Sequence, residues 1–142
     1  MGTHEHKQHA PKNVTIGIIT VSTTRALIDD SSGEWINRQA VNEGHEVIYH
    51  QVIPDDAKII ASTVRDVIRH QRPQLILMTG GTGIAEKDVT IEAVSPMFGK
   101  MLTAFGPLFA NLSFEEIGSA AFLSRATAGV IEKAVVFCMP GS

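Results

Sequence analysis

The chain has 142 residues, of which 44% are hydrophobic and 19% charged, and its formal net charge is −3. These values are ordinary for one globular domain with a proper core, and the interspersed lysines and arginines exclude the basic surface of a nucleic-acid-binding protein. No apolar run approaches the roughly 20 residues of a membrane span, and the single cysteine, Cys138, excludes an internal disulfide. We therefore expect a cytoplasmic protein that binds neither membrane nor nucleic acid.

The chain begins with a polar, aperiodic stretch, residues 1–13, which has no apolar centre and is therefore not a secretory signal. We expect it to be a flexible tail. Its histidines at positions 4, 6 and 9 have the chemistry of metal ligands, but a flexible tail would not hold them in a fixed geometry, so solvated side chains are the favoured interpretation. Residues 14–21 follow as a near-continuous β-branched run, which predicts a fully buried strand.

The next elements are a helix and an outer strand. Residues 29–33, Asp-Asp-Ser-Ser-Gly, form a predicted turn whose serines cap a helix over about 33–43. Gly44 ends that helix as the residue after its C-cap, and Trp35 in its first turn is expected to be packed. Residues 46–52 alternate between apolar and polar side chains, which is typical of an outer strand with one solvent-facing side.

The middle of the chain continues the alternation of helices and strands. Apolar residues at helical spacing predict a helix that follows Asp56 and ends at about residue 71. A short apolar run over 74–78 predicts a buried strand, and a short helix is expected over 90–95, ended by Pro96.

The last third of the chain predicts one more helix and a hairpin. Residues 97–119 are rich in Met and Phe, and we expect a helix over about 107–112 with Pro107 at its first position, where the missing N–H costs nothing. Residues 120–124 are read as a further helix or an irregular turn. Two strands, 126–131 and 134–139, then form a hairpin.

This order of elements predicts an α/β fold. Alternating strands and helices give a three-layer sandwich in which a mostly parallel central sheet is flanked by helices, with a short C-terminal hairpin. We expect residues 14–142 to form a single domain, because neither an internal repeat nor a linker interrupts them.

The most informative stretch is a glycine loop, residues 79–83, Thr-Gly-Gly-Thr-Gly, which follows a predicted buried strand and precedes a helix. Glycines allow the backbone to approach a ligand, so peptide N–H groups in such a loop can bind phosphate oxygens. The loop fits neither the Walker A motif nor the dinucleotide fingerprint, because Glu86 and Asp88 flank Lys87 and Glu86 stands where the fingerprint needs Gly or Ala. A simple turn between strand and helix remains the alternative.

Two aspartates are candidate metal ligands. If the ends of the parallel strands share one edge, Asp55, Asp88, the glycine loop and residues 22–25 share a crevice. One or two carboxylates beside a phosphate site are what Mg²⁺ requires. The alternative is that each aspartate only caps the helix that follows it. Cys138 is expected to be buried and inert, whereas Glu115 and Glu116 are either a solvated face or folded over the crevice.

Three separated segments resemble one family. They are Thr79-Gly-Gly-Thr-Gly with Asp88-Val-Thr-x-Glu-Ala93, then Leu112-Ser-Phe-Glu-Glu-Ile-Gly118, and finally Ser124-Arg-Ala-x-Ala-Gly129 with Met139-Pro-Gly-Ser142. They are similar to the MoaB and MogA family of molybdenum cofactor biosynthesis proteins, whose domain also occurs in the gephyrin and MoeA groups. The likeness extends from about Val14 to the last residue, and the second segment is closer to MoaB than to MogA.

The resemblance implies a molybdopterin-binding domain fold and a molybdopterin adenylyltransferase. Such an enzyme uses Mg²⁺ and joins molybdopterin to ATP, giving adenylyl-molybdopterin and pyrophosphate. The terminal phosphate of the pterin attacks the α-phosphorus of ATP, so no protein nucleophile is needed and catalysis is positioning plus charge neutralisation. The family also implies a homotrimer, or a hexamer of two trimers, and a downstream molybdenum-insertion protein as partner.

Carried over residue by residue, the resemblance implies that Asp55 and Asp88 are the catalytic, magnesium-binding aspartates. Phosphate and nucleotide binding would belong to the glycine loop, namely Thr79, Gly80, Gly81, Thr82 and Gly83. The pterin side would be formed by Ser124, Pro140, Gly141 and Ser142. Arg125 is a further contributor, and Asp56 is expected to be a helix cap.

The sequence departs from the family pattern in three places. Ile91 replaces a proline that the family usually has after Asp-Val-Thr, and Thr24 stands where many members carry Asp or Asn before the arginine. Relatives also continue beyond Pro-Gly-Ser with a C-terminal helix, which is absent from this sequence. In the family that helix would cover one face of the sheet and help to bind an anion.

Two other functions fit parts of the same pattern. A non-catalytic molybdopterin carrier or scaffold would bind the pterin without consuming ATP. An unrelated small nucleotide-binding domain would bind ATP and show no affinity for the pterin. The presence of both Asp55 and Asp88 favours the enzyme.

Overall fold

The computed structural model describes residues 2–10 and 12–141, with the backbone alone for residues 7–9. Its strands are β1 (Thr15–Val21), β2 (Glu46–Ile53), β3 (Leu75–Thr79), β4 (Lys100–Met101), β5 (Thr127–Ile131) and β6 (Ala134–Met139). Its α-helices are α1 (Thr3–His9), α2 (Ser31–Asn42), α3 (Ala57–Asp66), α4 (Thr90–Val94) and α5 (Phe105–Ile117). Shorter helical turns cover Leu27–Asp29, Val67–Gln71, Ser95–Met97 and Gly118–Leu123.

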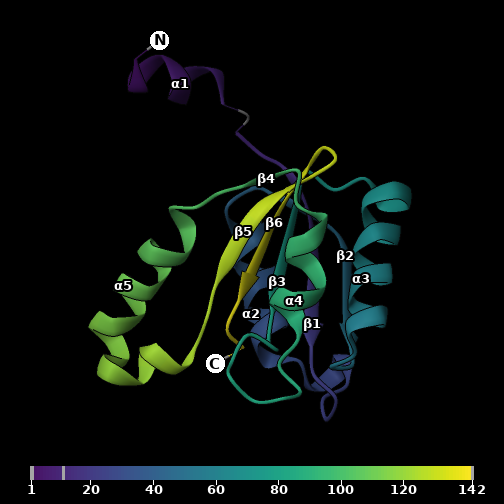
Figure 1. The fold of residues 1–142 in the computed structure, drawn as a ribbon. Coiled ribbons are helices and arrows are strands. Elements are labelled where there is room, and N and C mark those ends of the chain that lie inside the picture. Colours follow the sequence, from purple (N-terminus) through teal and green to yellow (C-terminus); the bar gives the residue numbers. More distant parts are fainter. Residues whose placement is uncertain (1, 11, 142) are drawn as a thin grey trace.

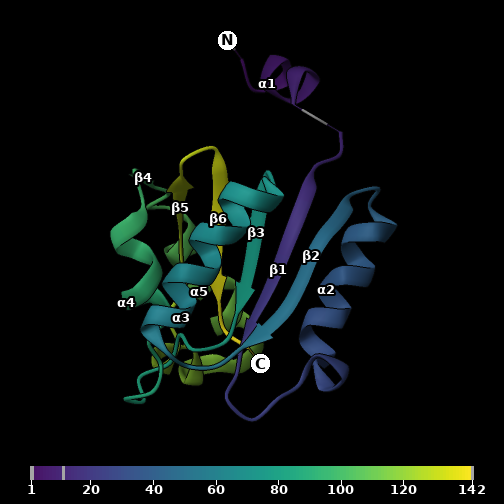
Figure 2. The ribbon, with the colours of Figure 1, turned by 90° about the vertical axis from the view of Figure 1, so that its right-hand side faces the viewer.

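The strands form one mixed sheet in the order β2-β1-β3-β6-β5-β4 (Figure 1). The first four strands are parallel to one another, and β5 and β4 add antiparallel pairs. The predicted α/β sheet with a C-terminal hairpin is therefore confirmed. Because the four parallel strands run in one direction, their carboxyl ends lie at the same edge, where the loop after β3 and the end of β6 also lie (Figures 1 and 2).

Helices cover both faces of this sheet, with α2 on one side and α3 and α4 on the other (Figure 2). Side chains alternate along β1, so Ile16 and Ile18 pack toward α2, whereas Ile19 and Val21 join the larger core with Ile60 of α3. Burying a side chain such as Ile60, which is fully inaccessible, contributes about 1.5–3 kcal/mol. Two cores of unequal size thus fix the central strands from both sides.

The helices differ from the sequence-based expectation in three respects. Asp30, not a serine, caps α2, since its Oδ1 accepts a hydrogen bond of 3.0 Å from the Gly33 amide. Pro107 is the third residue of α5, a helix that begins at Phe105 and continues to Ile117. Trp35, expected to be packed, is 57% exposed.

The predicted aperiodic tail contains a helix. Residues Thr3–His9 form α1, with the Gly2 amide donating to Glu5 Oε2 at 2.9 Å, which satisfies one of the free donors at the helix start. Figures 1 and 2 show α1 apart from the sheet. Within the described residues, no helix is long and apolar enough to cross a membrane.

Candidate functional site

A cavity of about 640 Å³ opens at the carboxyl edge of the parallel strands. Its floor is formed by the ends of β1 and β6 and by the glycine loop, and its outer wall by α5 and the turn that follows α5. Outside the glycine loop, the residues that line this cavity include Thr20, Ser22, Arg25, Asp88, Glu116, Ser124, Pro140 and Gly141. Ser22, Arg25, the glycine loop and Asp88 therefore line one crevice as predicted, whereas Asp55, which was expected to share it, is not among the lining residues.

The glycine loop needs glycine at two positions. Gly80 and Gly81 have φ angles of 96° and 71°, in the region that L-residues rarely adopt. A Cβ on Gly80 would collide with the Val21 carbonyl, and a Cβ on Gly81 with the Thr90 hydroxyl. The loop is thus packed tightly against β1 and the start of α4.

The carbonyl groups of this loop are held from behind. Thr90 donates its hydroxyl to the Gly80 carbonyl at 2.9 Å and its amide to the Gly81 carbonyl at 3.0 Å. Arg125 donates Nε to the Thr82 carbonyl and Nη2 to the Gly83 carbonyl, both at 3.0 Å. In a trans peptide the next N–H points opposite to the C=O. The amides of Gly81 and Thr82, which follow two of the held carbonyls, therefore point away from Thr90, whereas the Gly80 amide donates to the Met139 carbonyl at 2.9 Å.

Thr82 provides a further unused group in the loop. Its side chain is 2% exposed, and its hydroxyl has no hydrogen-bond partner among the residues that the structure describes. A buried polar group without a partner is costly, commonly about 1–3 kcal/mol. An oxygen-rich ligand bound in the loop would supply the missing partner.

Arg125 supports the loop. It forms an ion pair with Glu92 of α4, Nη1 to Oε2 at 2.6 Å, while its other nitrogens reach the loop carbonyls. The hydrogen bond from Arg125 lowers the pKa of Glu92, and Glu92 in turn raises the pKa of Arg125. This arginine therefore links the start of β5 to the glycine loop and α4, and it does not line the main cavity.

Asp88 is not a helix cap. The residue before α4 is Val89, which makes no side-chain cap, and Asp88 Oδ2 instead accepts a hydrogen bond of 3.0 Å from the Ala85 amide. A Cβ on Gly83 would lie 2.7 Å from the same oxygen. The carboxylate therefore lies against the glycine loop and lines the cavity.

Asp55 lies on the other side of the loop, at the end of β2. Its Oδ2 accepts hydrogen bonds from the amide and hydroxyl of Thr23, at 3.0 and 2.8 Å. Its Oδ1 lies 3.3 Å from where a Cβ on Gly81 would be. Asp56 caps α3, accepting from the Ile59 amide at 3.0 Å, as predicted.

The structure places most of the remaining predicted residues at or near the cavity. Ser124, Pro140 and Gly141 line the cavity, and Glu116 lines it too, whereas Glu115 does not. The Thr79 side chain is buried beneath the loop, 3.4 Å from the Thr20 hydroxyl. Ser142 lies outside the described residues. Cys138 is buried as expected, and burial raises the pKa of its thiol to about 12.

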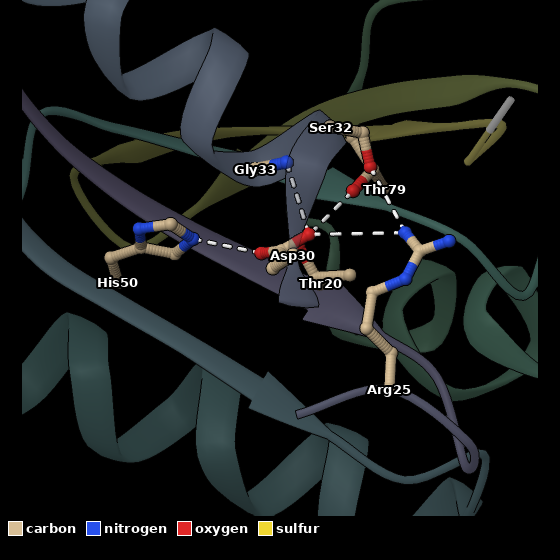
Figure 3. A network of polar contacts seen from close by, with 7 residues as sticks. All are labelled: Thr20, Arg25, Asp30, Ser32, Gly33, His50 and Thr79. Carbon is tan, nitrogen blue, oxygen red and sulfur yellow. Dashed lines mark hydrogen bonds and ion pairs between the residues drawn. The ribbon is translucent and has the colours of Figure 1, made fainter. Parts of the chain in front are cut away.

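The sequence did not reveal a buried network behind the cavity, shown in Figure 3. Asp30 Oδ2 accepts a hydrogen bond from the Thr20 hydroxyl at 2.7 Å and lies 2.8 Å from His50 Nε2. Burial raises the pKa of Asp30, but the hydrogen bonds from Thr20, His50 and Gly33 outweigh it and lower the pKa. The only sign of this network in the sequence was the run Asp29–Gly33, which looks like any turn that caps a helix.

Comparison with known proteins agrees with the fold and identifies the family. The family model of a probable molybdopterin binding domain matches residues 17–142. A molybdenum cofactor biosynthesis protein B from Bacillus subtilis is 43% identical over all of this chain and 84% of its own length. A protein from Pyrococcus furiosus named molybdopterin adenylyltransferase is 40% identical over all of this chain and 86% of its own length.

Solved structures show the same relationship. A crystal structure of a molybdenum cofactor biosynthesis protein B superposes with a TM-score of 0.89 at 42% identity, covering 94% of this chain and 84% of the other. The tungsten cofactor synthesizing protein MoaB from Pyrococcus furiosus superposes with a TM-score of 0.82 at 38% identity, covering 94% and 85%. The chain therefore belongs to the molybdopterin-binding domain family and is most similar in these comparisons to its MoaB members.

Proposed function

We propose that the protein is a molybdopterin adenylyltransferase of molybdenum cofactor biosynthesis. The observation that carries the proposal is the glycine loop, whose carbonyls are held by Thr90 and Arg125 so that the amides of Gly81 and Thr82 point away from Thr90 and would bind phosphate. The relative from Pyrococcus furiosus that bears this name supports the same reaction. Asp55 and Asp88, whose carboxylates lie close to Gly81 and Gly83, would add the carboxylates for the reaction.

In this reaction an oxygen of the pterin's terminal phosphate forms a bond to the α-phosphorus of ATP, and the bond from that phosphorus to the bridging oxygen of pyrophosphate breaks. The attacking group is already an anion, so the protein need not remove a proton. The loop amides would hold the phosphates in line, and the buried Thr82 hydroxyl would gain a partner. Ser124, Pro140 and Gly141 would contact the pterin side.

The donor set suits Mg²⁺. Hard oxygen ligands from one or two carboxylates, completed by phosphate and water, are what this ion prefers, and Asp55 Oδ1 is not used in the contacts with Thr23. Among the described residues no group of three His, Cys, Asp or Glu side chains is assembled, which fits an ion that arrives with ATP. Asp55 and Asp88 would hold Mg²⁺, whose charge would offset that of the phosphates.

The test is pyrophosphate release when the protein is mixed with ATP, Mg²⁺ and molybdopterin. The wild type should release pyrophosphate, and Asp88→Asn should reduce the rate by about 100-fold or more while circular dichroism and thermal unfolding stay unchanged. Undiminished turnover by Asp88→Asn would refute the assignment of this residue. Stoichiometric pterin binding without pyrophosphate would instead indicate a carrier or scaffold protein.

We also propose that the protein assembles as a trimer or hexamer. The support is α5, which has no buried residue in the single chain although its sequence is strongly apolar. Its large exposed side chains include Leu108, Leu112, Phe114 and Ile117. Several large apolar side chains exposed on one helix are typical of a protein interface.

A further inference from the structure

We propose that Arg25 binds a phosphate group of a substrate and that buried Asp30 is the positioning residue that fixes Arg25 at the cavity. This inference rests on the proposed function only in taking a phosphate-bearing molecule as the ligand. It concerns residues that lie on the β1 side of the cavity, away from the support that Arg125 gives to the glycine loop. Residues 22–25 were expected at the crevice, but neither Arg25 nor Asp30 was assigned a role in binding substrate.

The charges around the cavity single out Arg25. Among the described residues that line the cavity, Arg25 is basic, whereas Asp88 and Glu116 are acidic. Lys87 is exposed and Arg125 is bound to Glu92, and neither lines this cavity. A polyanionic ligand would therefore meet one guanidinium there, which has the planar set of donors that suits phosphate.

Arg25 keeps most of its hydrogen-bond donors for a ligand. Its Nη1 lies 3.4 Å from the Ser32 hydroxyl and 3.9 Å from Asp30 Oδ1. These contacts use one nitrogen of a group with five N–H donors, and the side chain remains 37% exposed. Figure 3 shows the guanidinium beside Asp30 and Ser32, with its second terminal nitrogen directed away from them.

The segment that carries Arg25 is fixed at two points. Asp55 binds Thr23 through both its amide and its hydroxyl, and Asp30 and Ser32 at the start of α2 meet the guanidinium. The segment therefore spans the ends of β1 and α2 with little freedom. A ligand phosphate would find the arginine already in place, which reduces the entropy lost on binding.

Asp30 does more than cap α2. A cap needs one oxygen, and Oδ1 meets that need through the Gly33 amide. Oδ2 is satisfied separately by Thr20 and His50, which leaves Oδ1 as the side facing Arg25. The carboxylate side chain is fully buried, so it is a fixed charge that sets where the guanidinium rests.

The experiment compares the dissociation constants for molybdopterin alone and for ATP alone, measured by calorimetry on the full chain, with KM and kcat for pyrophosphate release. Arg25→Gln should weaken binding of at least one ligand by about 10- to 100-fold, with a much smaller change in kcat. Arg25→Lys should recover part of the loss. Arg38→Gln, an exposed arginine of α2 outside the cavity, is the matched control and should match the wild type.

The positioning role is tested by coupling. Asp30→Asn and Ser32→Ala should each raise the KM that Arg25→Gln raises. Neither change should raise that KM much further when Arg25→Gln is already present. Ser32→Ala removes only a contact at the surface of the fold, so it can test the positioning role if the Asp30→Asn variant does not fold. Equal effects of both changes in the two backgrounds would overturn the positioning role.

Separate binding measurements with molybdopterin and with ATP distinguish this inference from the proposed function. If the change in affinity is confined to molybdopterin, Arg25 binds the pterin phosphate, and if it is confined to ATP, Arg25 binds the nucleotide phosphates. Arg25-dependent binding without pyrophosphate release would support the inference and refute the adenylyltransferase. An active wild type whose Arg25→Gln variant has unchanged dissociation constants and KM would overturn the inference alone, and binding of neither ligand would overturn both.

Discussion

Gly81 shows how much of the candidate site depends on single backbone positions. Gly81→Ala would place a methyl group against the Thr90 hydroxyl at a φ of 71°. We expect a loss of about 1–3 kcal/mol in the free energy of unfolding and a loss of activity at least ten-fold, because the amides of the loop would shift. Urea unfolding and pyrophosphate release would measure the two effects.

The control for this variant is Gly44→Ala. Gly44 also has a positive φ, of 88°, but a Cβ there would meet nothing within 4 Å, and the residue lies after α2, outside the cavity lining. The Gly44→Ala variant should lose unfolding free energy through similar backbone strain, and it should keep full activity per folded molecule. Equal activities of the two variants would show that the loop geometry is unimportant.

Asp30 predicts a stability effect at acidic pH. Its pKa is lowered in the folded protein from the ordinary value of 3.8, so the folded state favours the ionised carboxylate more than the unfolded chain does. The resulting stabilisation is fully present above about pH 4 and is lost as pH falls through the lower, folded pKa. Asp30→Asn should therefore show a weaker decline in unfolding free energy below pH 4 than the wild type. Parallel curves would contradict this.

At the scale of elements, Arg125 joins β5 to the glycine loop and α4. Arg125→Lys would keep the charge but lose the paired hydrogen bonds to the Thr82 and Gly83 carbonyls. We expect turnover to fall about ten-fold or more and the unfolding free energy to fall by about 1–3 kcal/mol, because two part-buried carbonyls lose their donors, while the exposed ion pair itself contributes little. Steady-state kinetics with denaturant unfolding would separate the effects.

A matched control is available at the opposite edge of the sheet. Arg69 and Glu132 form another exposed pair, with Nε and Oε1 3.5 Å apart, near the amino ends of β3 and β6, whereas the glycine loop lies at the carboxyl end of β3. Arg69→Lys should leave both turnover and stability close to the wild type. If Arg125→Lys and Arg69→Lys lose activity equally, the loss at Arg125 would not come from its support of the glycine loop.

The parallel strands could be predicted because their pattern is local. β1 is buried on both faces, and β3 is buried on one face and partly buried on the other, which requires continuous apolar runs that any short window of sequence reveals. The two-residue β4 has no such pattern, and its pairing with Val130 and Gly129 depends on the tertiary fold. The cap of α2 was misassigned because Asp30, Ser31 and Ser32 are all good capping residues, and the choice among them depends on Thr20 and His50.

The candidate site was predictable to a similar extent. The glycine loop and the strand-end positions of Asp55 and Asp88 followed from the motif and from the direction of parallel strands. What could not be predicted were contacts between distant parts of the chain, such as Arg125 reaching carbonyls 42 and 43 positions earlier. Sequence patterns report periodicity and loop chemistry, whereas such contacts are set by the fold.

At the scale of the whole molecule, the exposed face of α5 carries the last prediction. Leu108 and Leu112 are one helical turn apart and are 63% and 62% exposed in the single chain. Burying two such side chains at an interface contributes roughly 1.5–3 kcal/mol each. Placing a charge there would reverse that contribution and add a desolvation cost.

The double variant Leu108→Glu/Leu112→Glu should therefore assemble less than the wild type. Light scattering should show a trimer or hexamer for the wild type and a smaller species for the variant, with α-helix content unchanged by circular dichroism. Val41→Glu, on the exposed side of α2, is the control and should keep the wild-type mass. A monomeric wild type would refute the predicted assembly, and an unchanged mass for the double variant would place the interface elsewhere on the molecule.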